Sequence, residues 1–287
     1  MAALLAAPAA AGERVQRATT TFGEVAYWDE GFGEPTVVLL HGLPTSKELW
    51  ADVIPGLALD HRVLALDLNN FGDSERVGRA LTHDQRAAAL DELRATLNLD
   101  GFILVAHDLG ASVAIDYMDA YAEHVDRLVL VSAPAYPGVE APRAITRLQG
   151  AGVGRLLVRL APRAHYRQAL RDGMVHEERI QESAVERFAS RYSGPGGARA
   201  LSENVAWGTP ETTFAHYPET LAAPQVPTLI LHGSQDPWIP VAHAAQLDRT
   251  IADSHLVVVG EAGHYLPLDA PGAVVREIRS FLATPAP

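Results

Sequence analysis

Short, continuous apolar runs recur along the chain and predict buried strands. Strands that are apolar throughout are typical of a sheet that is covered on both faces. An earlier and more mixed segment, Phe22–Asp29, suits an antiparallel strand at the edge of that sheet. The apolar runs are Val37–Leu40, Arg62–Leu66, Phe102–Ala106, Leu128–Val131, Thr228–Leu231 and Leu256–Val259.

Segments with a helical repeat of apolar residues separate these runs. The alternation of strand and helix predicts a parallel sheet that is wound by right-handed crossovers, with helices on both faces. The helices are expected at Ser46–Leu57, Thr82–Leu97, Ala111–Ala122, Pro240–Ile251 and Ala273–Leu282.

The alternation stops between Ala135 and Ala223, where no strong strand pattern occurs. This segment is rich in arginine and helical in pattern, and it is interrupted by Pro162 and by a glycine-rich turn at Ser193–Gly197. We expect it to form a helical cap over the carboxyl ends of the strands, where open α/β sheets bind ligands. The predicted organisation is a flexible tail at 1–18, a core at 19–134 and 224–287, and the cap at 135–223.

Composition narrows the class of protein. The 287 residues suffice for one α/β domain with an insertion, and the formal net charge of −12 argues against nucleic acid or an anionic membrane as a partner. The absence of cysteine excludes disulfides, thiolate catalysis and zinc held by cysteine. Met1–Ala11 lacks the basic residues of a signal peptide, and no run reaches the roughly 18 apolar residues of a membrane span, so we expect a soluble cytoplasmic protein. The single lysine, Lys47, is attributed to genome composition.

Asp108 is the most informative residue, because it lies at the corner between the predicted strand Phe102–Ala106 and the predicted helix Ala111–Ala122. This strand–turn–helix layout usually presents the serine of a Gly-x-Ser-x-Gly motif. A carboxylate in the same place is ionised at neutral pH and can attack an electrophilic carbon directly, which gives an alkyl ester. Asp108 therefore predicts displacement at saturated carbon rather than the cleavage of an ester by serine.

A second motif, His41-Gly42-Leu43-Pro44, directly follows the strand Val37–Leu40. Glycine allows the backbone to turn beneath a ligand, so that the backbone N–H of Leu43 can point into the site. Together with the N–H of Leu109 it would form an oxyanion hole, in which two donors are aimed at developing negative charge.

An acid and a histidine follow the last two strands. Asp236 lies in the loop after Thr228–Leu231, and His264 lies shortly after Leu256–Val259. The chain order of nucleophile, acid and histidine is that of the α/β hydrolases. Asp236 would orient the imidazole of His264, which would then deprotonate a water molecule. Glu140 is the alternative position for the acid.

The chain resembles the aspartate-nucleophile branch of the α/β-hydrolase superfamily, the epoxide hydrolases and haloalkane dehalogenases. The resemblance covers nearly all of the chain outside the tail and is weakest in the cap. It implies an eight-stranded, mostly parallel sheet, with helices on both faces and a helical cap insertion. It is carried by His41-Gly42-Leu43-Pro44-Thr45-Ser46, Leu49-Trp50, Asp67-Leu68, Gly72-Asp73-Ser74, His107-Asp108-Leu109-Gly110, Asp236 and His264.

Departures from the family pattern distinguish the two activities. Haloalkane dehalogenases usually hold the leaving halide with an Asn after His-Gly and a Trp after the nucleophile, but these positions are Leu43 and Leu109 here. Losing such a donor costs on the order of 3 kcal/mol, about two decades in rate. Trp207 is the candidate replacement. The resemblance therefore favours opening of an epoxide to a diol, with haloalkane dehalogenation as the alternative.

Epoxide hydrolases protonate the leaving oxygen with tyrosines of the cap. The Asn-Trp-Tyr-Arg segment often found late in their cap is absent here, so the candidate acids are Tyr166, Tyr192, Tyr217 and His165.

A non-hydrolytic biosynthetic catalyst or a ligand-binding protein on the same fold is a further alternative. We expect no metal and no organic cofactor, because the nucleophile, the base and the oxyanion donors are all present in the chain. The expected partners are a small apolar organic substrate and water, and the expected assembly is a monomer or a homodimer. The cap residues expected to line the pocket or pack beside it are Leu156, Leu157, Val158, Leu160, Phe188 and Trp207.

Overall fold

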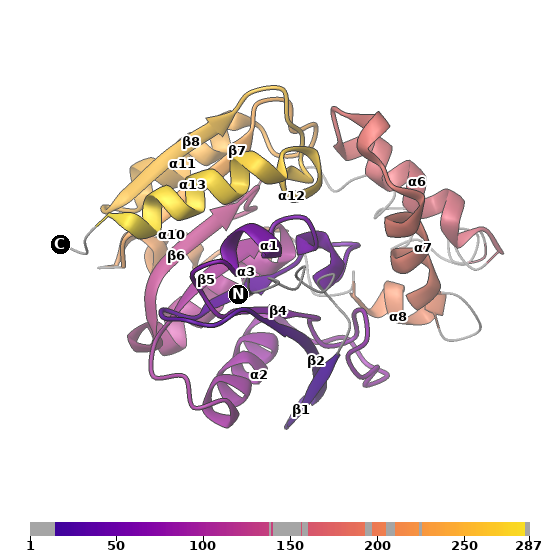
Figure 1. Cartoon of the computed structure of the whole chain (residues 1–287), viewed down its shortest axis with the longest axis horizontal. Helices are drawn as coiled ribbons and strands as arrows, with labels where there is room; N and C mark the ends of the chain where they lie inside the picture. The colour runs from indigo at the N-terminus through magenta and orange to yellow at the C-terminus, as the bar shows by residue number, and fades with distance from the viewer. Residues whose placement is uncertain are drawn as a thin grey trace, which may run out of the picture.

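The computed structural model of the chain describes residues 15–137, 139, 156, 160–192, 197–204, 210–223 and 226–284. Its centre is an eight-stranded sheet with the strand order β1-β2-β4-β3-β5-β6-β7-β8 (Figure 1). The six strands predicted from apolar runs all pair in parallel, as expected. They are β3 (Val37–Leu40), β4 (Val63–Leu66), β5 (Phe102–His107), β6 (Val125–Val131), β7 (Thr228–Gly233) and β8 (Ser254–Val259).

The start of the sheet differs from the prediction, because one more strand precedes the predicted edge strand. The segment Phe22–Asp29 forms β2 (Gly23–Glu30), which pairs antiparallel with β4. It is not the edge strand, because β1 (Gln16–Thr20) pairs with its other side. The tail predicted at 1–18 therefore ends too late, since residues 16–18 belong to the sheet.

Helices cover both faces of the sheet. On one face α1 (Ile54–Leu57) contacts α13 (Pro271–Ala283), and both lie in front of the strands in Figure 1. On the other face a continuous series of helix contacts joins α2 (His83–Thr96), α3 (Leu109–Tyr121), α10 (Tyr217–Ala222) and α11 (Val241–Thr250).

The helix expected at Ser46–Leu57 is divided into η1 (Lys47–Trp50) and α1. The cause is Pro55, which occupies the first turn of α1. Inside a continuous helix its ring would clash with the preceding turn, and its missing N–H would break a hydrogen bond. The remaining short elements beside the core are η2 (Ala122–His124) and α12 (Leu266–Asp269).

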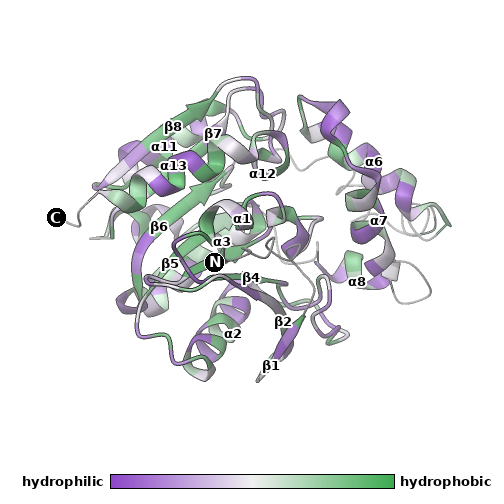
Figure 2. Cartoon of the chain, viewed as in Figure 1, coloured by the Kyte–Doolittle hydropathy of each residue, from purple (hydrophilic) through white to green (hydrophobic). Residues whose placement is uncertain are grey.

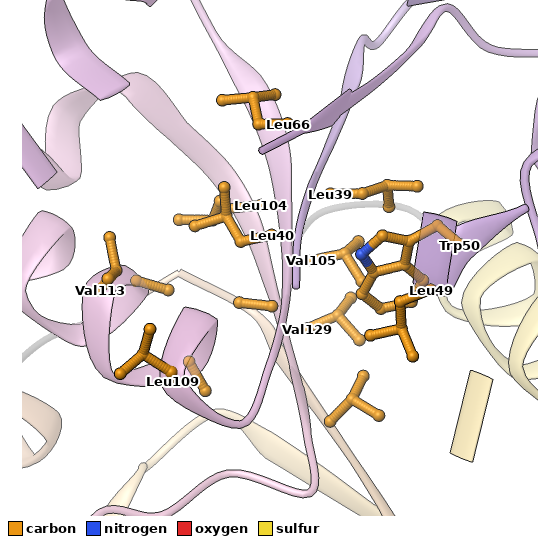
Figure 3. Packing of buried hydrophobic residues seen from close by; sticks show 14 of the residues in the cluster. Leu39, Leu40, Leu49, Trp50, Leu66, Leu104, Val105, Leu109, Val113 and Val129 are labelled. Atoms are coloured by element: carbon orange, nitrogen blue, oxygen red, sulfur yellow. The ribbon is translucent and has the colours of Figure 1, made fainter. Parts of the chain in front are cut away.

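The core is built from strand side chains that alternate between the two helical layers. Figure 3 shows Leu40 and Leu104 on the side of α3, where Val113 lies, and Leu39 and Val105 on the side of Trp50. Leu39 and Val105 are register partners on β3 and β5. Because both faces of these strands are buried, no polar position interrupts them.

The described stretches between β6 and β7 form helices and contain no strand, as the pattern predicts. Helices α6 to α8 lie to one side of the sheet in Figure 1, and Figure 2 shows that they contain both polar and apolar residues, whereas strands β6 to β8 are largely apolar. The last helix of this segment, α10, instead packs against α3 and α11 of the core. The described elements are α6 (Pro162–Gly173), η3 (Glu177–Arg179), α7 (Glu182–Arg191), α8 (Gly197–Asn204), α9 (Pro210–Thr213) and α10.

Among the described helices, none has the length and apolar character required to cross a bilayer.

Candidate active site

Asp108 occupies the sharp turn between β5 and α3. Its backbone has φ 49° and ψ −119°, a left-handed conformation that is strained for a residue with a Cβ atom. The turn is tight because a Cβ atom on Gly110 would lie 2.6 Å from the carbonyl oxygen of His41, so only glycine fits there. The strained turn aims the Asp108 side chain, which is 20% exposed, away from the core.

The loop after β3 supplies a donor to this carboxylate. The N–H of Leu43 donates to Oδ1 of Asp108 at 2.7 Å, and the backbone of Leu109, the next residue, helps to hold the pKa of this carboxyl below its ordinary value. Gly42 permits this approach, because a Cβ atom there would lie 2.4 Å from Cβ of Asp108. The structure thus brings both predicted oxyanion donors, Leu43 and Leu109, to Asp108.

The orientation of the Leu43 donor is fixed through the carbonyl of Gly42. That oxygen accepts hydrogen bonds from Nδ1 of His41 at 2.9 Å, from N of Thr45 at 3.0 Å and from Oγ1 of Thr45 at 2.9 Å. Because a peptide group is planar, holding its C=O also fixes the direction of the N–H of Leu43. Burial lowers the pKa of His41 to about 3, so the ring is neutral, and its Nε2 accepts a hydrogen bond from N of Leu68.

His264 lies between the two aspartates predicted from the sequence. Its Nδ1 donates to Oδ2 of Asp236 at 2.9 Å, and its Nε2 is 3.5 Å from Oδ2 of Asp108. Oδ1 of Asp236 accepts the N–H groups of Trp238 at 2.9 Å and Ile239 at 3.0 Å. The Asp236 side chain is fully buried, whereas that of Asp108 is partly exposed. Asp236 therefore holds the imidazole of His264 from within the core, and Asp108 is the carboxylate that solvent reaches.

The charges of the three groups stabilise one another. Burial alone would lower the pKa of His264, but the charges and hydrogen bonds of Asp236 and Asp108 outweigh it and raise that pKa to about 10. Burial would raise the pKa of Asp236, but His264 and the two backbone donors lower it to about 2. The pKa of Asp108 is likewise held below its ordinary value by His264, against the effect of burial. At neutral pH the site therefore holds a histidinium between two carboxylates.

Two contacts to the backbone of His264 were not foreseen from the sequence. Nε2 of His107 donates to the carbonyl oxygen of His264 at 3.0 Å, and burial lowers the pKa of His107 to about 4, so its ring is neutral. The N–H of His264 donates to the carbonyl oxygen of Gly173 at 2.7 Å, at the end of α6. The only sequence signal for the role of His107 was its position next to Asp108.

The four predicted acids differ in what their side chains contact. The Tyr217 hydroxyl donates to the carbonyl oxygen of Ser112 at 3.1 Å, in the core layer. The Tyr192 hydroxyl accepts a hydrogen bond from Nδ2 of Asn204 at 3.3 Å. The Tyr166 hydroxyl is buried and has no hydrogen-bond partner within the described part of the chain, and the ring of His165 meets the edge of the Tyr166 ring. Of the three tyrosines, Tyr166 is thus the one whose hydroxyl makes no hydrogen bond within the described residues.

The other expected cap residues have mixed outcomes. Phe188 is buried and stacks on Tyr166, as a packing residue should. The prediction is wrong for Leu156 and Leu160, whose exposed fractions are 51% and 71%. Their positions face solvent because no other described element covers them. Glu140, Leu157, Val158 and Trp207 lie outside the described residues.

Across the described stretches, no cluster of three or more His, Asp or Glu side chains is arranged to hold a metal ion.

The chain is similar in sequence to several proteins that are named as hydrolases or dehalogenases. The chain is 26% identical to 2-hydroxy-6-oxo-6-(2'-aminophenyl)hexa-2,4-dienoic acid hydrolase of Metapseudomonas resinovorans, over 91% of this chain and 88% of that protein. It is 28% identical to haloalkane dehalogenase 2 of Mycobacterium bovis, over 89% and 90%. It is 25% identical to epoxide hydrolase 3 of Xenopus tropicalis, over 86% and 71%. The resemblance to epoxide hydrolases and haloalkane dehalogenases is confirmed by these matches.

Solved structures share the fold over almost the whole chain. Wild-type Cfl2 from Burkholderia cenocepacia has a TM-score of 0.81 and 26% identity, covering 93% of this chain and 95% of that one. The epoxide hydrolase CorEH has a TM-score of 0.81 and 24% identity, covering 94% and 98%. The family described as alpha/beta hydrolase fold matches residues 35–271. The strand order, the turn at Asp108 and this match together show that the chain belongs to the α/β-hydrolase fold family.

Proposed function

We propose that this chain is a hydrolase that opens an epoxide to a diol through an alkyl ester on Asp108. The observation that carries the proposal is the placement of the carboxylate itself. Oδ1 of Asp108 receives the Leu43 N–H at 2.7 Å, while Oδ2 lies 3.5 Å from Nε2 of His264. Oδ2 is therefore the attacking oxygen, and Oδ1 becomes the ester carbonyl that the Leu43 N–H already holds.

The two leucines of the oxyanion hole favour an epoxide over a haloalkane. A departing halide needs N–H donors of its own, and the side chains of Leu43 and Leu109 supply none. The oxygen of an epoxide stays attached to the substrate and needs only a proton. We assign that proton to Tyr166, because its buried hydroxyl makes no hydrogen bond to any described residue and so can donate to a substrate oxygen. Dehalogenation is the alternative, supported by the relative from Mycobacterium bovis.

The residues of the site supply and take up every proton that the reaction needs. In the first step Oδ2 of Asp108 bonds to a ring carbon, the carbon–oxygen bond of the epoxide breaks, and the ring oxygen takes the proton of Tyr166. The proton that His264 carries at rest restores Tyr166 through solvent and leaves the imidazole neutral.

In the second step neutral His264 removes a proton from water, and hydroxide adds to Cγ of Asp108. The tetrahedral intermediate collapses and Oδ2 leaves on the diol with the proton of the added hydroxyl. The charged pair of Asp108 and His264 is then restored. A small apolar epoxide and water are the two reactants, and no step requires a metal or an organic cofactor.

A single turnover in heavy-oxygen water tests the proposal. We expect the label in the Asp108 carboxylate and unlabelled Oδ2 in the diol, because water attacks the ester carbonyl and not the substrate. His264→Gln should still be alkylated, so that its mass rises by that of the substrate, but should not release product. Asp108→Ala should do neither. Label found directly in the diol, with none in Asp108, would show that His264 delivers water to the substrate and that Asp108 is no nucleophile.

A substrate panel separates the alternatives. Terminal epoxides, haloalkanes and activated esters are offered to the same preparation, and the products are read by mass spectrometry. We expect ring opening to be the fastest reaction. Halide release without ring opening would favour the dehalogenase, ester turnover alone would contradict both, and binding without turnover would favour a ligand-binding protein.

A further inference from the structure

Asp269, the last residue of α12, is a fully buried carboxylate that the proposed reaction does not use. Its oxygens accept three backbone N–H groups. Oδ2 accepts those of Gly263 at 2.7 Å and Val175 at 2.9 Å, and Oδ1 accepts that of His176 at 2.9 Å. A buried carboxylate with three charge-assisted hydrogen bonds is a strong local constraint on the backbone that it holds.

The three donors come from two distant parts of the chain. Gly263 directly precedes His264, whereas Val175 and His176 follow α6, more than 85 residues earlier. One carboxylate therefore ties the loop of the proposed base to the segment that leaves α6.

Other contacts join the same two segments. The N–H of His264 donates to the carbonyl oxygen of Gly173, and Arg179 of η3 donates to the carbonyl oxygen of Asp269. The backbones approach so closely that a Cβ atom on Gly263 would lie 2.3 Å from the Gly173 oxygen. The position of His264 is thus determined by residues 173–176 as well as by Asp236.

We propose that Asp269 is a positioning residue, which locks segment 173–176 to the loop of His264 and thereby aims the imidazole at the water that hydrolyses the ester. The description of the reaction as alkylation followed by ester hydrolysis rests on the proposed function. Tyr166 lies on the same helix, but its ring stacks between Tyr192 and Phe188, so loss of Asp269 should disturb it less than it disturbs His264.

The test is Asp269→Asn, which keeps the shape of the side chain but turns one acceptor into a donor that faces a backbone N–H. Alkylation and ester hydrolysis are followed separately by rapid quench and intact mass. We expect alkylation within about threefold of wild type and hydrolysis about 100-fold slower, so that the ester accumulates, because a shift of 1 Å in a reacting group can cost that much. Asp269→Glu, which keeps the charge but moves it by one methylene, should show the same split with a smaller factor.

The matched control is Asp29→Asn, at a carboxylate that pairs with Arg62 through bonds of 2.9 and 2.7 Å and makes no contact with this loop. It should leave the ratio of the two rates unchanged. If Asp269→Asn slows both steps equally, or no more than the control does, Asp269 is merely structural and the inference is wrong. If wild type and His264→Gln both fail to form an ester, the proposed function has failed instead.

Amide hydrogen exchange tests the lock without reference to the reaction. In Asp269→Asn we expect the peptides that contain residues 174–176 and 263–264 to lose protection together, while both keep it in Asp29→Asn. Loss in only one of the two segments would overturn the proposed coupling, whatever reaction the site performs.

Discussion

A histidine held between two carboxylates changes its basicity when one of them is esterified. In the resting site Asp236 and Asp108 together raise the pKa of His264 to about 10 against the effect of burial. An ester on Asp108 carries no charge, so the share of that increase which comes from Asp108 is lost once the substrate is attached. In the proposed reaction the same imidazole therefore holds a proton before alkylation and acts as a base after it.

The two steps should differ in their dependence on pH. Alkylation needs ionised Asp108 but no proton held by His264, so we expect it to be constant across the neutral range and to fall only below the ordinary carboxyl pKa of 3.8. Ester hydrolysis needs neutral His264 and should rise with pH through a pKa that is clearly below 10. Rapid-quench profiles of both steps measure this. A hydrolysis step that rises only near pH 10 would mean that Asp108 contributes nothing to the basicity of His264.

Tyr166 should act through its hydroxyl alone. Tyr166→Phe keeps the ring, which stacks on Tyr192 with centroids 5.7 Å apart, and removes only the oxygen. We expect alkylation by an epoxide to slow by about 100-fold or more, the usual contribution of a general acid. Stability should hardly change, because the hydroxyl has no hydrogen-bond partner within the described residues. Tyr192→Phe is the matched control, and a larger loss there would reassign the acid to Tyr192.

Elements far apart in the chain are joined by one buried ion cluster. Nζ of Lys47, in η1, lies 2.6 Å from Oδ2 of Asp67 at the end of β4 and 2.7 Å from Oδ2 of Asp73. Asp73 also accepts a bond of 2.8 Å from Nη2 of Arg191, at the end of α7. Although burial would lower the pKa of Lys47, the adjacent carboxylates raise it, so the amine is charged. The cluster connects the loop beyond β3 and the end of β4 to a helix of the insertion.

Removing the buried Lys47 from this cluster should lower the stability of the fold far more than removing the partly exposed Arg191. Lys47→Met leaves Asp67 buried without its cationic partner, which we expect to lower the free energy of unfolding by about 3–5 kcal/mol. Arg191→Ala breaks only a half-exposed pair and should cost about 1 kcal/mol or less. Urea denaturation followed by circular dichroism measures both. Equal losses would show that Lys47 is no more buried in solution than Arg191.

At the scale of the whole molecule, the parallel part of the sheet could be predicted because helices cover both of its faces. Its strands are therefore apolar throughout and stand out from the rest of the chain. β1 could not be predicted in this way, since Gln16–Thr20 is mostly polar and gains its order by pairing with β2. The helical pattern of α10 likewise could not tell that it packs on α3, which places Tyr217 in the core layer and not over the site.

The candidate site also has a part that could be predicted from the sequence and a part that could not. Asp108, Asp236 and His264 could be predicted to meet, because each follows its own strand at one edge of the sheet. The role of Asp269 could not be predicted, because two of its three donors are backbone N–H groups 94 and 93 residues away, and nearly every residue type carries such a group. Contacts of this kind become visible only when the chain is folded.

The burial of Lys47 also has a practical consequence. It is the only lysine of the chain, and its amine is enclosed by carboxylates with no exposed side-chain surface. Reagents that biotinylate, crosslink or immobilise proteins through lysine therefore have no such handle on the folded surface. The same property makes the peptide that contains Lys47 a built-in reporter of unfolding, since its amine becomes reactive only when the surrounding structure opens.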